Sequence, residues 1–287
     1  MIGFDELGDK GWLGNQMFQY ASLRGIAAHR GYDFCIPPEN TGRTNYLLHD
    51  IFRLTGVKNT GYIGGLYKHP TSDDVCHSTT FHFNEEFFNE CPDGVNISGF
   101  YQSEKWFKDI EDEIRKDFQF KYEIRSICES FLRNFDITPI FVHIRRGDFV
   151  DRPDYHYNLP MEYFEEGISK FDKDIPILLF SDDIKWCYEQ EMFKSDRFNL
   201  SETKERLPMT EFLKGQYTES ALIPYFDMCF MTLCDGGVMS NSTFSWWGAW
   251  LQKDRTRDII CPAKDKWGGR LNTSDYSDIA AKDWITL

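Results

Sequence analysis

Hydrophobic and polar positions follow a regular order from residue 138 onward, where short apolar runs alternate with stretches of helical periodicity. The predicted strands lie at 140–144, 176–180, 197–200, 237–239 and 258–261. The predicted helices lie at 161–171, 184–193, 219–234 and 243–252. Strands that alternate with helices in this way predict a parallel sheet covered by helices on both faces.

The first half of the chain begins with the same strand, loop and helix order. A short apolar segment at 2–4 leads into a Gly-rich loop, and a helix with apolar positions at helical spacing follows and ends at Gly31. Residues 32–100 show no regular pattern apart from an expected strand at 95–100, and 104–134 is expected to be helical. The chain is therefore predicted to be an α/β protein.

Two Rossmann-like halves that face a cleft are the predicted architecture. The length of 287 residues suits two domains of ordinary size. We place the boundary near residue 137, which gives an N-terminal half of residues 1–137 and a C-terminal half of residues 138–287.

Charge and cysteine content exclude several classes of function. The formal net charge of −14 argues against a nucleic-acid partner and against an electrostatic grip on anionic lipid. The eight cysteines have neither CxxC spacing nor the Cys/His clustering of a zinc site, and they suit a reducing compartment. The chain shows no 18-residue apolar run and no signal-peptide pattern, so we expect a cytoplasmic protein, at most peripheral at a membrane.

Polar clusters follow three of the predicted strands in the second half. They read HIRRGD at 143–148, SDD at 181–183 and SNST at 240–243. Ligands of open parallel sheets bind beyond the carboxyl ends of the strands, and these ends share one edge. The three clusters are therefore expected to converge.

The paired arginines raise the question of an anion site in an acidic protein. Arg145 and Arg146 offer planar donor forks that suit phosphate, and they would supply local positive charge. Alternation along a strand would direct the two side chains to opposite sides, so we expect one of them to grip phosphate directly.

The other two clusters complement the arginines. Ser242 and Thr243 stand at a predicted helix N-terminus, where free N–H groups favour an anion. Asp182 or Asp183 could accept hydrogen bonds from a nucleobase or ribose. Together these groups predict a site for a nucleoside diphosphate.

Each cluster taken alone also has a structural interpretation. The arginine turn could be a surface salt-bridge network, and the serine and aspartate clusters could cap helices. Their occurrence at three strand ends favours the ligand site. In the first half, Asn15 and Gln16 at a loop-to-helix junction could bind a diol or cap the helix, and the spacing leaves both open.

Three stretches resemble the motifs of a known family. WLGNQMFQYA at 12–21, HIRRGD at 143–148 and SNSTFSWWGAWL at 240–251 resemble those of α-1,2-fucosyltransferases of glycosyltransferase family 11, in the same order and over nearly the whole chain. One departure is Trp12, which stands where members often have a glycine, and this leaves acceptor choice open.

The resemblance implies a two-domain fold of the GT-B type. It also implies inverting transfer of L-fucose from GDP-β-L-fucose to the 2-hydroxyl of a terminal galactoside, without a bound metal or other cofactor, because GDP-fucose is a co-substrate. Carried over by position, the resemblance implies that Arg145 binds the diphosphate of the donor and that Arg146 supports Arg145. The expected donor-binding residues are Arg145, Arg146, Asp182, Ser240, Asn241, Ser242 and Thr243, while Asn15 and Gln16 are expected on the acceptor side.

Arg145, Asp148 and His143 are the candidate catalytic residues. A carboxylate just past the arginine pair (Asp148, Asp151 or Asp154) or a flanking imidazole (His143 or His156) could take the acceptor proton, and Asp148 is favoured. Asp148 could instead only brace Arg145. A non-catalytic protein that binds a nucleotide or glycan, and a transferase for another GDP-sugar or linkage, are the alternative functions.

Overall fold

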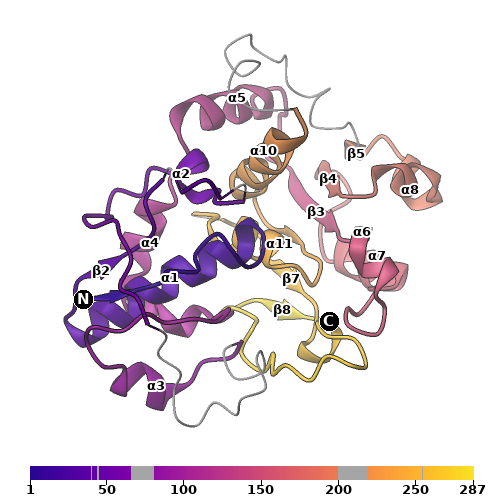
Figure 1. The fold of residues 1–287 in the computed structure, drawn as a ribbon. Helices are drawn as coiled ribbons and strands as arrows, with labels where there is room; N and C mark the ends of the chain where they lie inside the picture. Colours follow the sequence, from indigo (N-terminus) through magenta and orange to yellow (C-terminus); the bar gives the residue numbers. More distant parts are fainter. Residues whose placement is uncertain (40, 44, 66–80, 200–218, 254) are drawn as a thin grey trace. The chain divides into compact units, whose positions relative to one another are not determined.

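The computed structural model describes residues 1–287 except 40, 44, 66–80, 200–218 and 254 (Figure 1). It divides into two compact units, one made of 1–119 and 273–281 and the other of 120–272 and 282–287. The boundary predicted near residue 137 differs from this division, and the assignment of acceptor and donor sides to the two halves stays a prediction.

Helix α5 (Tyr122–Leu132) explains why the division falls before residue 137. It packs against α10 (Glu219–Leu233) of the second unit, where the rings of Phe131 and Phe230 lie 5.3 Å apart. This ring contact joins α5 to the second unit, although the helix precedes the first strand of that unit's sheet.

A six-stranded parallel sheet forms the second unit, as the alternating pattern predicted. Its strands run in the order β5-β4-β3-β6-β7-β8. Their bounds are β3 Ile140–Ile144, β4 Ile177–Ser181, β5 Phe198–Asn199, β6 Gly237–Val238, β7 Ile259–Cys261 and β8 Ile285–Thr286. Strand β3 lies inside the sheet between β4 and β6, and all five of its residues are buried.

Helices cover the sheet of the second unit, and an apolar cluster fills the space beneath them. Tyr163 and Phe164 of α7 belong to a buried cluster with Val142 and Leu179 of the strands. The helices are α6 Gly147–Asp151, α7 Met161–Ser169, α8 Ile184–Glu189, η3 Glu191–Lys194, α10, α11 Thr243–Trp250 and η4 Lys264–Lys266. Burial on both faces explains why these strands read as continuous apolar runs.

The first unit has less regular structure. Strand β1 (Ile2–Gly3) pairs in parallel with β2 (Phe34–Cys35), and α1 (Leu13–Arg30) ends at Gly31, whose φ of 70° is the left-handed cap that glycine favours. The strand predicted at 95–100 is wrong, because this segment contributes only a bridge from Asn96 to Gly3 among the described residues.

The remaining helices are short. They are α2 Leu48–Ile51, α3 Glu85–Glu90, η1 Glu104–Trp106, η2 Lys108–Ile110 and α4 Glu111–Asp117. The stretch predicted as helical from 104 to 134 is therefore broken into η1, η2, α4 and α5. Within the described parts of the chain, no helix combines the length and apolarity that a membrane crossing requires.

Candidate active site

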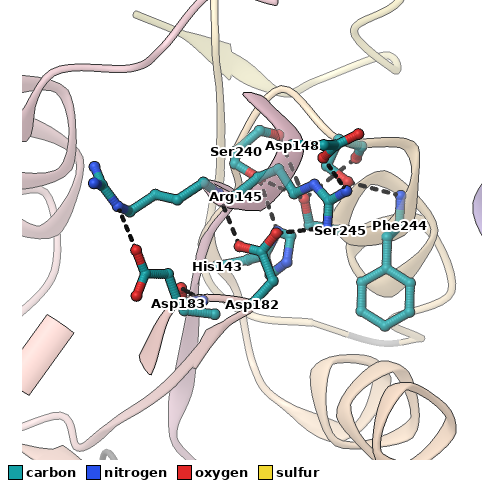
Figure 2. Close-up of polar contacts among 11 residues, drawn as sticks. His143, Arg145, Asp148, Asp182, Asp183, Ser240, Phe244 and Ser245 are labelled. Atoms are coloured by element: carbon teal, nitrogen blue, oxygen red, sulfur yellow. Dashed lines mark hydrogen bonds and ion pairs between the residues drawn. The ribbon is translucent and has the colours of Figure 1, made fainter. Parts of the chain in front are cut away.

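Three strand ends of the second unit meet at one edge of the sheet, as the sequence predicted. Arg145 and Arg146 follow β3 directly. The neighbouring strand β4 pairs Ser181 with Ile144 and leads into Asp182 and Asp183, while β6 on the other side leads to 239–242. The parallel register therefore brings the arginines, the aspartates and the serine-rich turn together (Figure 2).

Arg145 is held between two carboxylates. Its Nη1 lies 2.7 Å from Oδ2 of Asp182, and its Nη2 donates a hydrogen bond to Oδ1 of Asp148 (Figure 2). Its guanidinium carbon lies 5.4 Å from the centre of the Phe149 ring. The two carboxylates hold the guanidinium fork in place. Because the side chain is still 27% exposed, the fork remains open to a ligand.

Arg146 has other partners. Its backbone N–H donates to Oδ1 of Asp182 at 2.8 Å, and its Nε donates to Oδ2 of Asp183 at 3.1 Å. Its guanidinium carbon lies 3.8 Å from the centre of the Trp186 ring, a cation–π contact. The sequence analysis missed Trp186, although an aromatic residue three positions beyond a strand-end aspartate is a visible signal.

The two arginines do not make the site locally positive, in contrast to the expectation from the sequence. Three carboxylates, those of Asp148, Asp182 and Asp183, pair with two guanidinium groups. Gly147 permits this arrangement, because a Cβ at that position would lie 2.3 Å from Oδ2 of Asp182. The site offers fixed donors rather than excess charge.

His143 is a buried member of the site. It is 6% exposed, and its Nδ1 lies 2.8 Å from Oγ of Ser240, which is itself fully buried. Burial, and to a smaller extent the charge of Arg145, lower the pKa of His143 from 6.5 to about 3. The ring is therefore neutral near pH 7.

The lowered pKa of His143 predicts a loss of stability in acid. Because the folded pKa lies below the unfolded value, the unfolded chain takes up a proton below about pH 6.5 that the folded protein cannot bind. As the pH falls below this value, His143 alone should lower the free energy of unfolding by about 1.4 kcal/mol per pH unit. Between about pH 7 and about pH 5, the urea midpoint of His143→Asn should therefore fall less than that of the wild type. Equal falls would contradict this prediction.

The serine-rich turn caps α11. Oγ of Ser242 accepts a hydrogen bond from the N–H of Phe244 at 3.3 Å, and the N–H of Ser242 donates to the carbonyl of Ser240 at 2.8 Å. Thr243 is the first helical residue, and the first turn carries no acidic side chain. The capping interpretation is confirmed, and the helix N-terminus still offers the N–H groups that an anion could use.

Asn241 has a structural task. Its Nδ2 donates to the carbonyls of Tyr157 at 2.7 Å and Lys266 at 2.9 Å, and the residue is 4% exposed. Its amide nitrogen thus joins the turn before α11 to the loop at Tyr157 and to the end of η4. Its expected contact with the sugar donor stays a prediction. Asp183 likewise caps α8, where its Oδ1 accepts from the N–H of Trp186 at 3.2 Å.

Asn15 and Gln16 belong to the first unit. Helix α1 already begins at Leu13, so the interpretation of Asn15 and Gln16 as helix caps is wrong. Gln16 is fully buried, and its side chain accepts from the N–H of Leu47 at 3.0 Å and donates to the carbonyl of Asn45. Asn15 accepts from Nε2 of Gln102 at 2.9 Å. A role in acceptor binding stays a prediction for both.

The chain as a whole matches a family of known enzymes. Residues 4–287 match the family described as glycosyl transferase family 11. The O-antigen biosynthesis glycosyltransferase WbnK of Escherichia coli is 28% identical in a match that covers 70% of this chain and 65% of the length of WbnK. An α-1,2-colitosyltransferase of E. coli is 26% identical over 96% of both chains. The galactoside α-(1,2)-fucosyltransferase 2 of Sus scrofa is 26% identical over 86% of this chain and 69% of its own.

Solved structures share the fold at low sequence identity. Fucosyltransferase NodZ from Bradyrhizobium superposes with a TM-score of 0.51 at 12% identity, over 86% of this chain and 91% of its own. NodZ α-1,6-fucosyltransferase soaked with GDP-fucose gives a TM-score of 0.52 at 14% identity, over 87% of this chain and 91% of its own. The predicted α/β fold of the GT-B type is confirmed.

Proposed function

Because this chain belongs to glycosyl transferase family 11, we propose that it transfers L-fucose from GDP-β-L-fucose to the 2-hydroxyl of a galactose-terminated glycan, with inversion at the anomeric carbon. The observation that carries the proposal is Arg145, which two carboxylates clamp at the end of β3, next to the strand β6 that leads into α11. A guanidinium fork and a helix N-terminus at one sheet edge suit the diphosphate of a nucleotide sugar.

The exposures of its two carboxylate partners indicate how Arg145 would receive the diphosphate. The Asp148 side chain is 55% exposed and the Asp182 side chain is 27% exposed. The Asp148 carboxylate is the partner that an incoming phosphate would displace, since solvent already competes for it. Asp182 would stay in place and keep the fork oriented, while the first turn of α11 would provide further donors.

The reaction we propose is a single displacement. The acceptor oxygen forms a bond to the anomeric carbon as the bond from that carbon to the diphosphate oxygen breaks, and GDP leaves with the electron pair. Charge that builds on the diphosphate would be stabilised by Arg145 and by the α11 N–H groups. Asp148, once displaced from Arg145, would take the proton of the acceptor hydroxyl.

Replacing Asp148 by asparagine tests this assignment. Asparagine keeps the size of the side chain but removes both the competing charge and the base. We therefore expect the Kd for GDP to stay level or fall, while kcat falls by about 10²-fold. Calorimetry with GDP and initial rates at saturating substrates would measure the two effects. An unchanged kcat would leave Asp148 as a brace for Arg145 alone.

Colitose is a second candidate for the transferred sugar. The α-1,2-colitosyltransferase of E. coli matches 96% of this chain and 96% of its own length, a wider match than those of the two other relatives described above. Colitose is fucose without the 3-hydroxyl, so the same diphosphate site would serve both donors. Only a group that hydrogen-bonds the 3-hydroxyl would separate them.

One incubation tests the proposed function. The purified protein would be mixed with lactose and other β-galactosides and either GDP-fucose or GDP-colitose, with and without EDTA, and the products read by mass spectrometry. We expect the gain of one deoxyhexose, unaffected by EDTA, with the 2-linkage established by NMR. Tight GDP binding without product from any acceptor would favour the non-catalytic alternative. Absence of both would overturn the donor site.

A further inference from the structure

We propose that His143 is a positioning residue, which holds the start of α11 in register with Arg145 through its hydrogen bond to Ser240. This inference rests on the proposed function, because it treats Arg145 and α11 as the two sides of the donor site. It gives His143 a different role from that of the proton acceptor expected from the sequence.

The position of the bond in the sheet is the first observation. The backbone pairing of β3 with β6 ends at Val142 and Val238. His143 and Ser240 lie just beyond this last pair, and Nδ1 and Oγ approach to 2.8 Å (Figure 2). The side-chain bond therefore continues the connection between the two strands where the backbone ladder stops.

A second link carries the connection into the helix. Oγ of Ser240 lies 3.5 Å from Oγ of Ser245, one turn into α11. The Ser245 hydroxyl lies 3.3 Å from the carbonyls of both Ser240 and Ser242, so it closes the turn that precedes the helix. His143, Ser240 and Ser245 are all buried, and buried polar groups that satisfy one another fix a single arrangement.

The geometry explains the consequence for the donor site. Arg145 follows His143 by two residues on the same chain segment, and Ser242 follows Ser240 by two residues on the other. A shift at the His143–Ser240 bond would change the separation of the guanidinium group from the first turn of α11. A displacement of about 1 Å in such a site can cost on the order of 10²-fold in rate.

Burial argues against a direct role in proton transfer. His143 is 6% exposed, and the Phe244 ring lies 5.7 Å from its own. Its Nδ1 is already engaged by Ser240. The ring is thus packed as a spacer between β3 and the helix rather than presented to a substrate.

Two substitutions separate the roles. Asparagine places a polar atom at the position of Nδ1, which bonds Ser240, whereas glutamine places its polar atoms further out, at the position of Nε2. Neither side chain can act as a base. We expect His143→Asn to keep the GDP Kd and kcat/KM within about threefold of the wild type. His143→Gln should raise the GDP Kd about 10-fold and lower kcat/KM by about 10²-fold, with no change in the shape of the pH profile.

Ser240→Ala is the matched control from the other side of the bond. It should reproduce the loss seen in His143→Gln, and the double variant should be no worse than either single variant, because both remove one interaction. Thermal unfolding of each variant would show that the comparison is made on folded protein.

The outcomes are distinct. Equal losses of turnover in the Asn and Gln variants, with GDP binding intact, would overturn the inference in favour of proton transfer. A wild-type Kd in His143→Gln or Ser240→Ala would also overturn it. A wild-type protein that binds no GDP would overturn the proposed donor site and this inference with it.

Discussion

Replacement of Arg145 by alanine should lower kcat/KM for the donor by about 10²–10³-fold while leaving the fold intact. The reason is that a fixed donor aimed at the leaving diphosphate stabilises charge that develops in the transition state. Arg145 is fixed in this way by Asp182 and Asp148, and its side chain remains 27% exposed. Initial rates with GDP-fucose and calorimetry with GDP would measure the loss, and thermal unfolding would confirm the fold.

Two further variants sharpen this test. Arg145→Lys keeps the charge but cannot reach both carboxylates with one planar fork, so it should recover only part of the activity. Arg270→Ala removes a 77% exposed arginine of the same unit that pairs with Asp154, and its turnover should remain that of the wild type. If Arg145→Ala retained normal turnover, the assignment of the donor site would fail.

Replacement of Asp117 by alanine should destabilise the first unit by about 3–5 kcal/mol, the largest effect on stability that we predict. Asp117 is 1% exposed and accepts hydrogen bonds through both carboxylate oxygens. Oδ2 accepts from the Tyr20 hydroxyl at 2.6 Å and from Arg24, and Oδ1 accepts from the Gly56 N–H at 2.6 Å and the Thr55 hydroxyl at 3.2 Å. Alanine would leave the Arg24 guanidinium group, on a side chain that is only 14% exposed, without its counter-ion.

A urea titration followed by circular dichroism would measure this effect. A loss of this size is a large share of the total stability of a typical domain, so the variant should also express poorly. Glu113→Ala, on the same helix but exposed, is the matched control and should change the free energy of unfolding by less than about 0.5 kcal/mol. An unchanged midpoint for Asp117→Ala would show that its buried network contributes little.

The strands of the second unit could be read from the sequence because burial on both faces makes them apolar throughout. Strand β3 begins and ends at the predicted residues, Ile140 and Ile144. Strand β8 was missed, because its two residues, Ile285 and Thr286, are exposed and carry no such signal. The stop of α1 at Gly31 was also predictable, since a left-handed cap favours glycine.

The first unit was harder to predict because its structure depends on contacts between distant segments. Gln16 holds the backbone at residues 45–47, and Asp117 contacts residues more than sixty positions away, such as Gly56 and Tyr20. The sequence around Gln16 and Asp117 does not indicate which distant residues they contact. Residues 95–100 have the composition of a strand, yet the described part pairs only through a bridge at Asn96.

The sequence by itself determined the fold class, the family motifs and the three polar clusters, because periodicity and parallel topology are local or nearly local properties. Only the tertiary structure decided what each polar side chain does. It pairs Arg145 with Asp148 and Asp182, leaves His143 buried against Ser240, and engages the Asn241 amide with the carbonyls of Tyr157 and Lys266. These roles depend on burial and on distances of about 3 Å between side chains and their partners, most of which are far apart in the chain, and the order of residues does not encode them on its own.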